Sequence, residues 1–450
     1  MMTVLYWIYC FSFAFDFRGE KGGSAVQYVF MAAALGSGLM MIATTPHALR
    51  GRPTSIMGVV WLIYLASTVI VAVTSGVVAS QYFRCLLPPL LFGISLGIGQ
   101  SLAARRYTAE DIVRPLLYAG MASVVWRFIY AIIISKIPMD EVRYEMLSPA
   151  IPLLFAAAAA SALLAPRMTA LPLIGGVLAL TSVLVSVTRS YILTLIAAAV
   201  SVGFVFVLSV VAKYWSAHDL RKKLIHVITG SVLVAVSLVA LYFVQPTVFE
   251  RWVERLFYHA GGRTTQDVTY LTRAAEAKAI WVLLEADPLR FIYGKGLGAN
   301  YYWHSSYYPE LLEVYPDTDE IGQDIFVPGH SVWTYSLFSG GGFAVACYAF
   351  MFFWLVFLGF ASGRLAMLRR TDALHLAYLP CIAGVCYFSQ TLTANPFGER
   401  FSAQILGLLV ALPQVFFLRS AMTQRNQLPA QTFAPFLPQP YAATTAHRTG

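Results

Sequence analysis

Charged residues are scarce in this chain of 450 residues. Asp, Glu, Lys and Arg together make up 12% of the sequence, whereas hydrophobic residues make up 58%. A soluble domain contains about 25% charged residues, so this chain has about half the charge that a water-facing surface needs. The mean hydropathy of +0.67 agrees. These values exclude an ordinary soluble enzyme, a disordered protein and a nucleic-acid-binding domain, in spite of a net charge of +9.

Cysteine is also rare, and none of the five cysteines lies in a polar loop. They are Cys10, Cys85, Cys347, Cys381 and Cys386. Without cysteines in polar loops, neither a disulfide framework nor a thiolate metal site is indicated. We interpret these residues as small buried side chains of the apolar segments.

Long apolar runs are abundant. A membrane-spanning helix needs about 20 apolar residues to cross about 30 Å of hydrocarbon. The sequence predicts twelve such spans, the first of them short enough to be tilted or shallow. They are 1–16, 25–45, 56–75, 84–103, 112–135, 149–165, 169–187, 190–212, 225–245, 331–360, 375–391 and 401–419.

Basic residues favour every second loop between these spans. They are Arg50 and Arg52, then Arg105, Arg106 and Arg114, then Arg167, then Lys213, Arg221, Lys222 and Lys223, and finally Arg364, Arg369 and Arg370. Because positively charged loops stay in the cytoplasm, these loops and both termini are predicted to be cytoplasmic. The tail 420–450 has little periodicity, so we expect it to be disordered.

One loop on the opposite side is long. Residues 246–330 contain twelve of the 22 acidic residues of the chain. Loops of this length are usually functional or separately folded, and the stretch 268–285 has the spacing of an amphipathic helix. The chain thus divides into spans one to nine (1–245), this outer loop (246–330), spans ten to twelve (331–419) and the tail. A chemical site is expected first in the loop.

Two residues at span ends are candidates for chemistry. Arg189 closes span seven before a very short outward turn, where a guanidinium suits an anion such as pyrophosphate. The alternative is an arginine that only snorkels to lipid head groups. His330 lies in Val327-Pro328-Gly329-His330, where the long loop re-enters the membrane. Histidine is well matched to general-base catalysis near neutral pH, although a loop histidine is often only a polar surface group.

Three further arginines are candidates for substrate binding. Arg263 and Arg273 lie in the long loop, where each is otherwise a solvated charge, and Arg273 has the spacing of a helical pair with Glu276. Arg127 lies within span five, where a charge is costly and usually functional.

Other motifs are weaker. We interpret Gly294-Lys295-Gly296-Leu297-Gly298 as a turn, because it lacks the spacing of a phosphate-binding loop. Gly340-Gly341-Gly342 is expected to break or kink span ten and to allow close helix packing. Asp317 and Asp319 are a weak candidate for a metal site. Asp16 and Glu20, in the first outward loop, are weak candidates for a catalytic acid.

The ordered set of motifs resembles the O-antigen ligase and polymerase family of bacterial cell-surface glycan assembly. Three features carry the resemblance: Thr188-Arg189-Ser190 before a short outward turn, the loop with Arg273, Asp287-Pro288 and the glycine run, and His330 followed by Gly340-Gly341-Gly342. Two details depart from the family pattern. Ser331 stands where Asn often follows the histidine, and five residues separate Pro288 from the glycine run. Either Arg263 or Arg273 therefore takes the role of the loop arginine.

The resemblance implies an all-α membrane glycosyltransferase of the GT-C-like type in the bacterial inner membrane, with its site facing the periplasm. The donor would be a glycan on undecaprenyl pyrophosphate, and the acceptor a sugar hydroxyl of the lipid A-core. His330 would be the general base of an inverting transfer. Arg189 with Arg263 or Arg273 would stabilise the pyrophosphate, with Arg127 facing the same cavity. Neither a metal nor another cofactor would be required.

Several alternatives stay open. A polymerase that joins lipid-linked glycans would share the donor chemistry, and related branches glycosylate proteins. A transporter or lipid flippase would show ionisable residues at mid-membrane and two similar halves. Arg127 is the one clear charge inside a span, and no internal repeat is visible. A scaffold role would leave the long loop unexplained.

Overall fold

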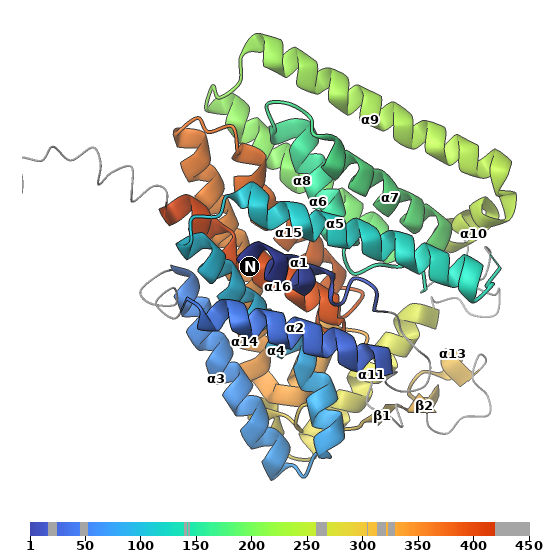
Figure 1. The fold of residues 1–450 in the computed structure, drawn as a ribbon. Helices are drawn as coiled ribbons and strands as arrows, with labels where there is room; N and C mark the ends of the chain where they lie inside the picture. The colour runs from blue at the N-terminus through green and yellow to red at the C-terminus, as the bar shows by residue number, and fades with distance from the viewer. Residues whose placement is uncertain are drawn as a thin grey trace, which may run out of the picture.

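The computed structural model describes residues 1–16, 25–45, 53–138, 142, 145–257, 268–303, 305–312, 321–322 and 329–418. Arg50, Arg52, Glu20, Arg263, Asp317, Asp319 and the tail 420–450 lie outside these residues. The described part is an all-helical bundle with one antiparallel pair of two-residue strands, in which Tyr302 pairs with Gly322 (Figure 1).

The helices of the first half follow the apolar runs. They are α1 (Met2–Phe11), α2 (Ala25–Ala43), α3 (Pro53–Thr74), α4 (Ala79–Ala104), α5 (Ala109–Phe128) with a π-helical turn (Ile129–Ile134), α6 (Ile151–Leu164), α7 (Ala170–Ser186), α8 (Arg189–Val211) and α9 (Ala217–Val244).

The second half contains the long loop and the last helices. Its elements are α10 (Pro246–Phe257), α11 (Val268–Glu285), α12 (Arg290–Tyr293), β1 (Tyr302–Trp303), a 3-10 turn (Ser305–Tyr307), α13 (Pro309–Leu312), β2 (Ile321–Gly322), α14 (Val332–Leu368), α15 (Leu374–Thr391), a 3-10 turn (Pro396–Gly398) and α16 (Arg400–Ala411).

The long apolar helices indicate a multi-pass membrane protein. Among the described residues, eight helices are long and apolar enough to cross a membrane. The other four expected spans are also helical, but α1, α6 and α7 have only 10, 14 and 17 residues, and α15 is not among the eight. The structure therefore supports a helical membrane protein with fewer clear spans than the twelve expected.

Helix ends differ from the expected span ends where polar residues cap or continue a helix. The helix α9 begins eight residues before 225, because Ser216 and Asp219 form a capping box that satisfies its first amides. The first helix ends at Phe11 rather than at residue 16, and Ser12 Oγ donates to the carbonyl of Tyr9. The helix α14 continues to Leu368, beyond the expected 360.

Small residues let the central helices approach closely. A Cβ added to Gly99 would meet Ala411 of α16, and one added to Gly407 would meet the backbone of Phe92 in α4. Gly359 and Gly363 form a small-xxx-small pair on α14 against α15. In a membrane, helices associate through such close packing rather than through the hydrophobic effect.

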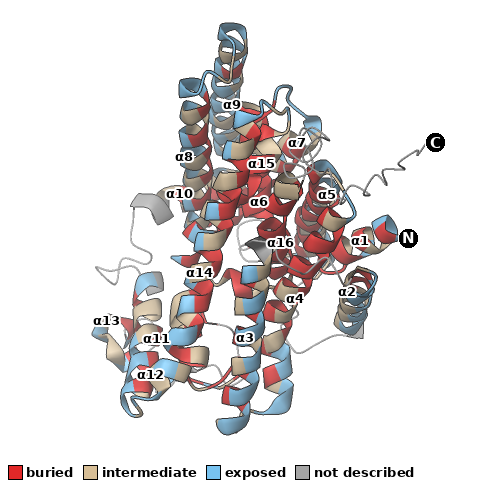
Figure 2. Cartoon of the chain, turned by 90° about the vertical axis from the view of Figure 1, so that its left-hand side faces the viewer, coloured by how far each residue is buried: buried red, intermediate tan, exposed pale blue. Residues whose placement is uncertain are grey.

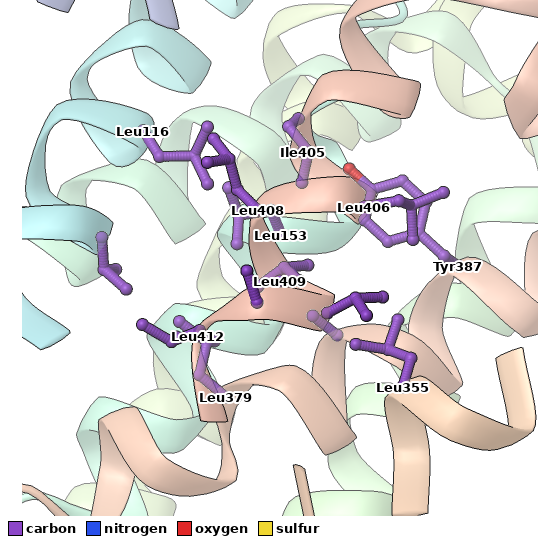
Figure 3. Packing of buried hydrophobic residues seen from close by; sticks show 14 of the residues in the cluster. Leu116, Leu153, Leu355, Leu379, Tyr387, Ile405, Leu406, Leu408, Leu409 and Leu412 are labelled. Carbon is purple, nitrogen blue, oxygen red and sulfur yellow. The ribbon is translucent and has the colours of Figure 1, made fainter. Parts of the chain in front are cut away.

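The buried core lies where α5, α6, α14, α15 and α16 converge. Figure 2 shows α6, α15 and α16 mostly buried at the centre, whereas α9 is mostly exposed. The close view in Figure 3 shows Leu116, Leu153, Leu355 and Leu379 around the α16 residues Ile405 and Leu409. All five cysteines are free and buried, as expected from the sequence.

The loops expected on one side do meet at one end of the bundle, which we call the basic end. Arg105 donates to Thr44 O and Thr45 Oγ1, and Thr3 bonds to Tyr107. A second group of contacts joins the segments next to α6, α8, α9 and α14. Lys223 Nζ donates to Ala165 O, Tyr214 Oη donates to Thr371 O and Arg370 Nη2 donates to Lys213 O. These contacts join described helix ends next to basic loops in two groups, while the predicted alternation of loops across a membrane stays a prediction.

The opposite end, which we call the His330 end, includes the long loop. The elements α10, α11, α13 and the strand pair gather along the right and lower right of Figure 1. The predicted helix over 268–285 is confirmed as α11, which buries Leu271, Ala275 and Ala279 on one face and Ile280 and Leu284 in a second cluster.

Candidate functional site

A buried carboxylate holds the ring of His330 just before α14. His330 Nδ1 lies 2.9 Å from Oε2 of Glu276, and the His330 amide donates to the same carboxylate. Because an ionised carboxylate only accepts hydrogen bonds, Nδ1 is the protonated ring nitrogen and Nε2 carries a lone pair. The His330 side chain is 51% exposed, whereas that of Glu276 is 3% exposed. The ring is anchored on one edge and open on the other, which is the arrangement of a general base with an orienting acid.

The carboxylate of Glu276 is itself fixed from a second side. Tyr301 Oη donates to Glu276 Oε1. Burial and the negative charge of Glu276 raise the pKa of Tyr301, so its hydroxyl stays protonated and keeps donating. A Cβ added to Gly329 would lie 2.5 Å from Glu276 Oε1 and 2.8 Å from Tyr301 Oη. Glycine before His330 therefore lets the backbone approach this pair.

A break in α14 anchors the loop that follows α11. Gly341 has φ 63° and ψ −162°, so the helix is interrupted there, as the triple glycine predicted. The break leaves helix carbonyls without their usual amide donors. Lys295 N donates to Phe338 O at 2.7 Å, and Gly296 N donates to Ser339 O at 3.0 Å. The glycine run is thus a turn, as expected, whose glycines have positive φ.

The short helix α12 ties the same loop to a second helix end. Arg290 Nη1 donates to Ser75 Oγ at 2.6 Å and to Gly294 O at 3.1 Å, and Arg290 Nε donates to Asp287 at 3.1 Å. Ser75 follows the last residue of α3. The loop that carries Glu276 and Tyr301 is therefore fixed to both α3 and α14.

Arg273 lies one turn before Glu276 in α11 and is half-buried. Residues three apart in a helix share a face, so Arg273 lies on the Glu276 side of α11. The helical spacing thus puts Arg273 on nearly the same face of α11 as Glu276, which is the partner of His330.

Arg189 follows a strained turn between α7 and α8. Val187 has φ 48° and ψ 47°, a left-handed conformation that is unusual for a β-branched residue and costs about 1–3 kcal/mol. Its side chain is buried against Val248 and Trp252 of α10, and Trp252 Nε1 donates to Leu184 O at 2.7 Å. Packing by α10 thus holds the turn that positions Arg189.

Arg189 is exposed and heads an exposed apolar stripe of α8. Leu193, Ile196 and Val200 follow at i+4, i+7 and i+11 and are also exposed. A cationic group at the end of an apolar stripe matches a lipid with an anionic head group.

Hydrogen bonds connect the helix ends around His330. Trp333 Nε1, one turn after His330, donates to Thr391 Oγ1 at 3.0 Å. Ser389 Oγ in α15 donates to Thr194 Oγ1 in α8 at 3.5 Å. The start of α14, the end of α15 and the start of α8 therefore meet at the His330 end, which brings Arg189 to the same end as His330.

Arg127 lies at the His330 end in a separate group of charges. Its Nη2 lies 3.3 Å from Glu399 Oε2, and Arg400 Nη1 lies 3.2 Å from Asp16 Oδ2. Arg127 is 6% exposed.

Glu276 and Tyr301 were not anticipated by the sequence analysis as partners of His330. Glu276 is separated from His330 by 54 residues, and its spacing to Arg273 offered a simpler explanation. The glycine before His330 was a usable signal, because it marks a close approach of the backbone. Arg263, the other loop arginine, lies outside the described residues.

Comparisons of the sequence with protein families and with curated proteins return no match. Within the described ranges, no group of three or more His, Cys, Asp and Glu side chains is arranged to hold a metal ion.

Proposed function

We propose that this chain is a membrane glycosyltransferase of the O-antigen ligase type, acting at the bacterial inner membrane. It would transfer a glycan from undecaprenyl pyrophosphate to a sugar hydroxyl of the lipid A-core. The observation that carries the proposal is the His330–Glu276 pair, a half-exposed imidazole held by a buried carboxylate at the mouth of a bundle of apolar helices.

The chemistry is a direct displacement at the anomeric carbon of the donor. Nε2 of His330 accepts the proton of the acceptor hydroxyl while that oxygen forms a bond to the anomeric carbon. The bond from this carbon to the pyrophosphate oxygen breaks, and the pyrophosphate leaves with the electron pair. The anomeric configuration is inverted. Glu276 stabilises the imidazolium as it forms, as a buried carboxylate does beside a catalytic histidine.

The leaving pyrophosphate needs positive charge close to its oxygens. Arg189 and Arg273 come from different elements at the His330 end and would supply fixed guanidinium groups. The exposed stripe Leu193, Ile196 and Val200 beside Arg189 supports a lipid donor, because its chain can run along α8 while its head group reaches the arginine.

Transfer by purified protein in liposomes tests the proposal. The reaction contains donor lipid and lipid A-core, with chelator and without nucleotide. We expect His330→Ala to reduce transfer by about 10²–10⁴-fold, the usual value of a general base, and Arg189→Ala to reduce it as well. His218→Ala and Arg221→Ala, both at the basic end, are matched controls and should retain activity.

Each other outcome has a defined meaning. Transfer that survives both His330→Ala and Arg189→Ala would contradict the assigned residues. A product in which only the lipid-linked glycan is lengthened would identify a polymerase, which shares the donor chemistry. No transfer to either acceptor would contradict a glycosyltransferase and favour a transporter.

A further inference from the structure

Four charged side chains from distant parts of the chain meet at the His330 end of the bundle. Arg127 in α5 pairs with Glu399, and Arg400 at the start of α16 pairs with Asp16, which follows α1. Gln27 Nε2 of α2 also donates to Asp16 Oδ1 at 3.3 Å. We call Asp16, Arg127, Glu399 and Arg400 the charge cluster. Charges among apolar helices are costly and usually mark function.

The two ion pairs act on each other. The pKa of Asp16 is raised, chiefly by burial and further by the charge of Glu399, while Arg400 and Arg127 lower it. The four side chains are at most 24% exposed. The cluster is thus one partly desolvated site whose formal charges sum to zero.

Two donors beside the cluster have no partner among the described residues. Arg127 Nε and Trp126 Nε1 are both buried and make no hydrogen bond there. A buried donor left unsatisfied costs about 1–3 kcal/mol, so each needs an explanation. The helix changes to a π-helical turn at Ile129, directly after α5, and such turns are frequent at functional sites.

Aromatic rings border the same place. Phe15 and Trp126 meet edge to face with centroids 6.0 Å apart, and Tyr130 lies 6.3 Å from Trp126. The guanidinium of Arg400 lies 5.7 Å from the Phe13 ring. The site therefore combines aromatic rings, of which those of Phe15, Trp126 and Tyr130 are half-buried, with carboxylates and with two buried N–H donors that have no partner among the described residues.

This combination suits a sugar better than an anion. A phosphate would face Asp16 and Glu399, which repel it. A sugar hydroxyl can donate to a carboxylate and accept from a guanidinium or an indole at once, and the apolar face of a sugar ring packs on aromatic rings. The net neutrality of the cluster fits a neutral ligand.

The chain sets an upper limit to the distance between the cluster and the start of α14, where the proposed base lies. Thr391 is held by Trp333, one turn after His330, and Glu399 follows Thr391 by eight residues. Eight residues span at most about 28 Å when fully extended, so Glu399 lies no further than about 28 Å from Thr391, a separation that an oligosaccharide can bridge.

We propose that Asp16, Arg127, Glu399 and Arg400, with Trp126, form a binding subsite for the acceptor glycan. This inference rests on the proposed glycosyltransferase function. It assigns the acceptor to the α1–α5–α16 side of the site, and it leaves the donor with Arg189 and Arg273.

Steady-state transfer in liposomes, with each substrate varied in turn, tests the subsite. We expect Trp126→Phe and Glu399→Gln to raise the KM for the acceptor about tenfold, the equivalent of about 1.4 kcal/mol for one lost hydrogen bond. The donor KM should change less than twofold. Trp354→Phe removes another buried indole N–H without a partner among the described residues, and Glu110→Gln removes an exposed acid near the basic end. Both controls should leave the acceptor KM unchanged.

A purely structural cluster would behave differently. If Glu399→Gln and Trp126→Phe lower the Tm and change both KM values in parallel, the cluster only locks α5 to α16 and the inference is wrong.

Binding without catalysis separates this inference from the proposed function. Saturation-transfer NMR with core oligosaccharide or with an O-antigen repeat oligosaccharide needs no donor. Binding of either sugar to the wild type that is weakened in Trp126→Phe supports the subsite even if no transfer is found. Absence of binding, or equal binding to the variant, overturns it.

Discussion

Glu276 is the residue on which the orientation of His330 depends. It accepts from the ring, from the His330 amide and from Tyr301, so both carboxylate oxygens are in use. A buried carboxylate in this position fixes the ring tautomer and stabilises the protonated ring. His330 therefore acts as part of a unit whose members come from α11, the segment before β1 and the start of α14.

Glu276→Gln tests this unit. Glutamine keeps the volume but removes the charge that stabilises the protonated ring, so we expect kcat for transfer to fall about 10²-fold with both KM values nearly unchanged. Glu285→Gln makes the same change at an exposed position of α11 and should have little effect. Equal kcat values for Glu276→Gln and the wild type would show that Glu276 has no positioning role.

The burial of Asp16 predicts the sign of a pH dependence of stability. Its pKa is raised in the folded protein because burial outweighs the attraction of Arg400. The stability that the neutral form contributes is present below the ordinary pKa of an aspartate and is lost as the pH rises through the raised value. Asp16→Asn resembles the neutral form and cannot ionise, so it escapes this loss.

We therefore expect the Tm of Asp16→Asn, relative to that of the wild type, to be more favourable at pH 8 than at pH 4. Thermal unfolding in detergent at the two pH values measures this. The exchange of a neutral carboxyl group for an amide adds an offset that is the same at both pH values, which is why the difference between them is the relevant quantity. A relative Tm that falls with pH would contradict the assigned direction.

The candidate residues at span ends could be predicted from the sequence, whereas the side chains that they contact could not. The site of His330 follows from a turn before an apolar run, and the sequence shows both. Its pairing with Glu276 depends on how α11 packs on α14, which apolar spacing does not encode. The same holds for Glu399 and Arg400, because nothing in the sequence near Arg127 or Asp16 indicates their partners.

At the scale of elements, the break in α14 and the glycine turn depend on each other. The turn supplies the amides of Lys295 and Gly296 to carbonyls near the break, and Gly341 lies against the backbone of Ile292 and Tyr293. The break was predictable because three glycines interrupt an apolar run. Its partner was not, because the glycine turn lies more than forty residues away in a different segment.

Gly341→Ala should disrupt this contact. Alanine at φ 63° is strained, and its Cβ would collide with the backbone of Ile292. We expect a loss of about 2–4 kcal/mol in stability and reduced transfer, because His330 precedes the same helix. Gly342→Ala is the matched control: its Cβ would lie 3.4 Å from Phe291 O, and its stability should change by less than about 0.5 kcal/mol. Equal stability of the two variants, measured by thermal unfolding, would show that the docked turn does not depend on the break.

At the scale of the whole molecule, the apolar runs predicted a helical membrane protein, and this is confirmed. The number of spans was less predictable. Length and composition select eight helices, whereas α1, α6 and α7 are shorter. The position of α6 depends on its neighbours, as its almost complete burial shows. The packing of helices that are distant in the sequence, such as α4 and α16, depends on small residues. The sequence shows these residues but not which helix each of them contacts.

The orientation of the bundle in the membrane is a prediction. It assigns the basic end and the His330 end to opposite sides of the membrane. Basic loops gather at one end, and the long acidic loop lies at the other, so the positive-inside rule places the site on the periplasmic side.

Because the five native cysteines are buried, a membrane-impermeant maleimide should label the wild type little. Glu285→Cys in α11 and Arg167→Cys after α6 are both exposed positions. In intact spheroplasts we expect labelling of Glu285→Cys only, and labelling of Arg167→Cys only after lysis. The reverse pattern would place His330 in the cytoplasm, where lipid A-core glycans facing the periplasm are out of reach, and would contradict both the topology and the proposed acceptor.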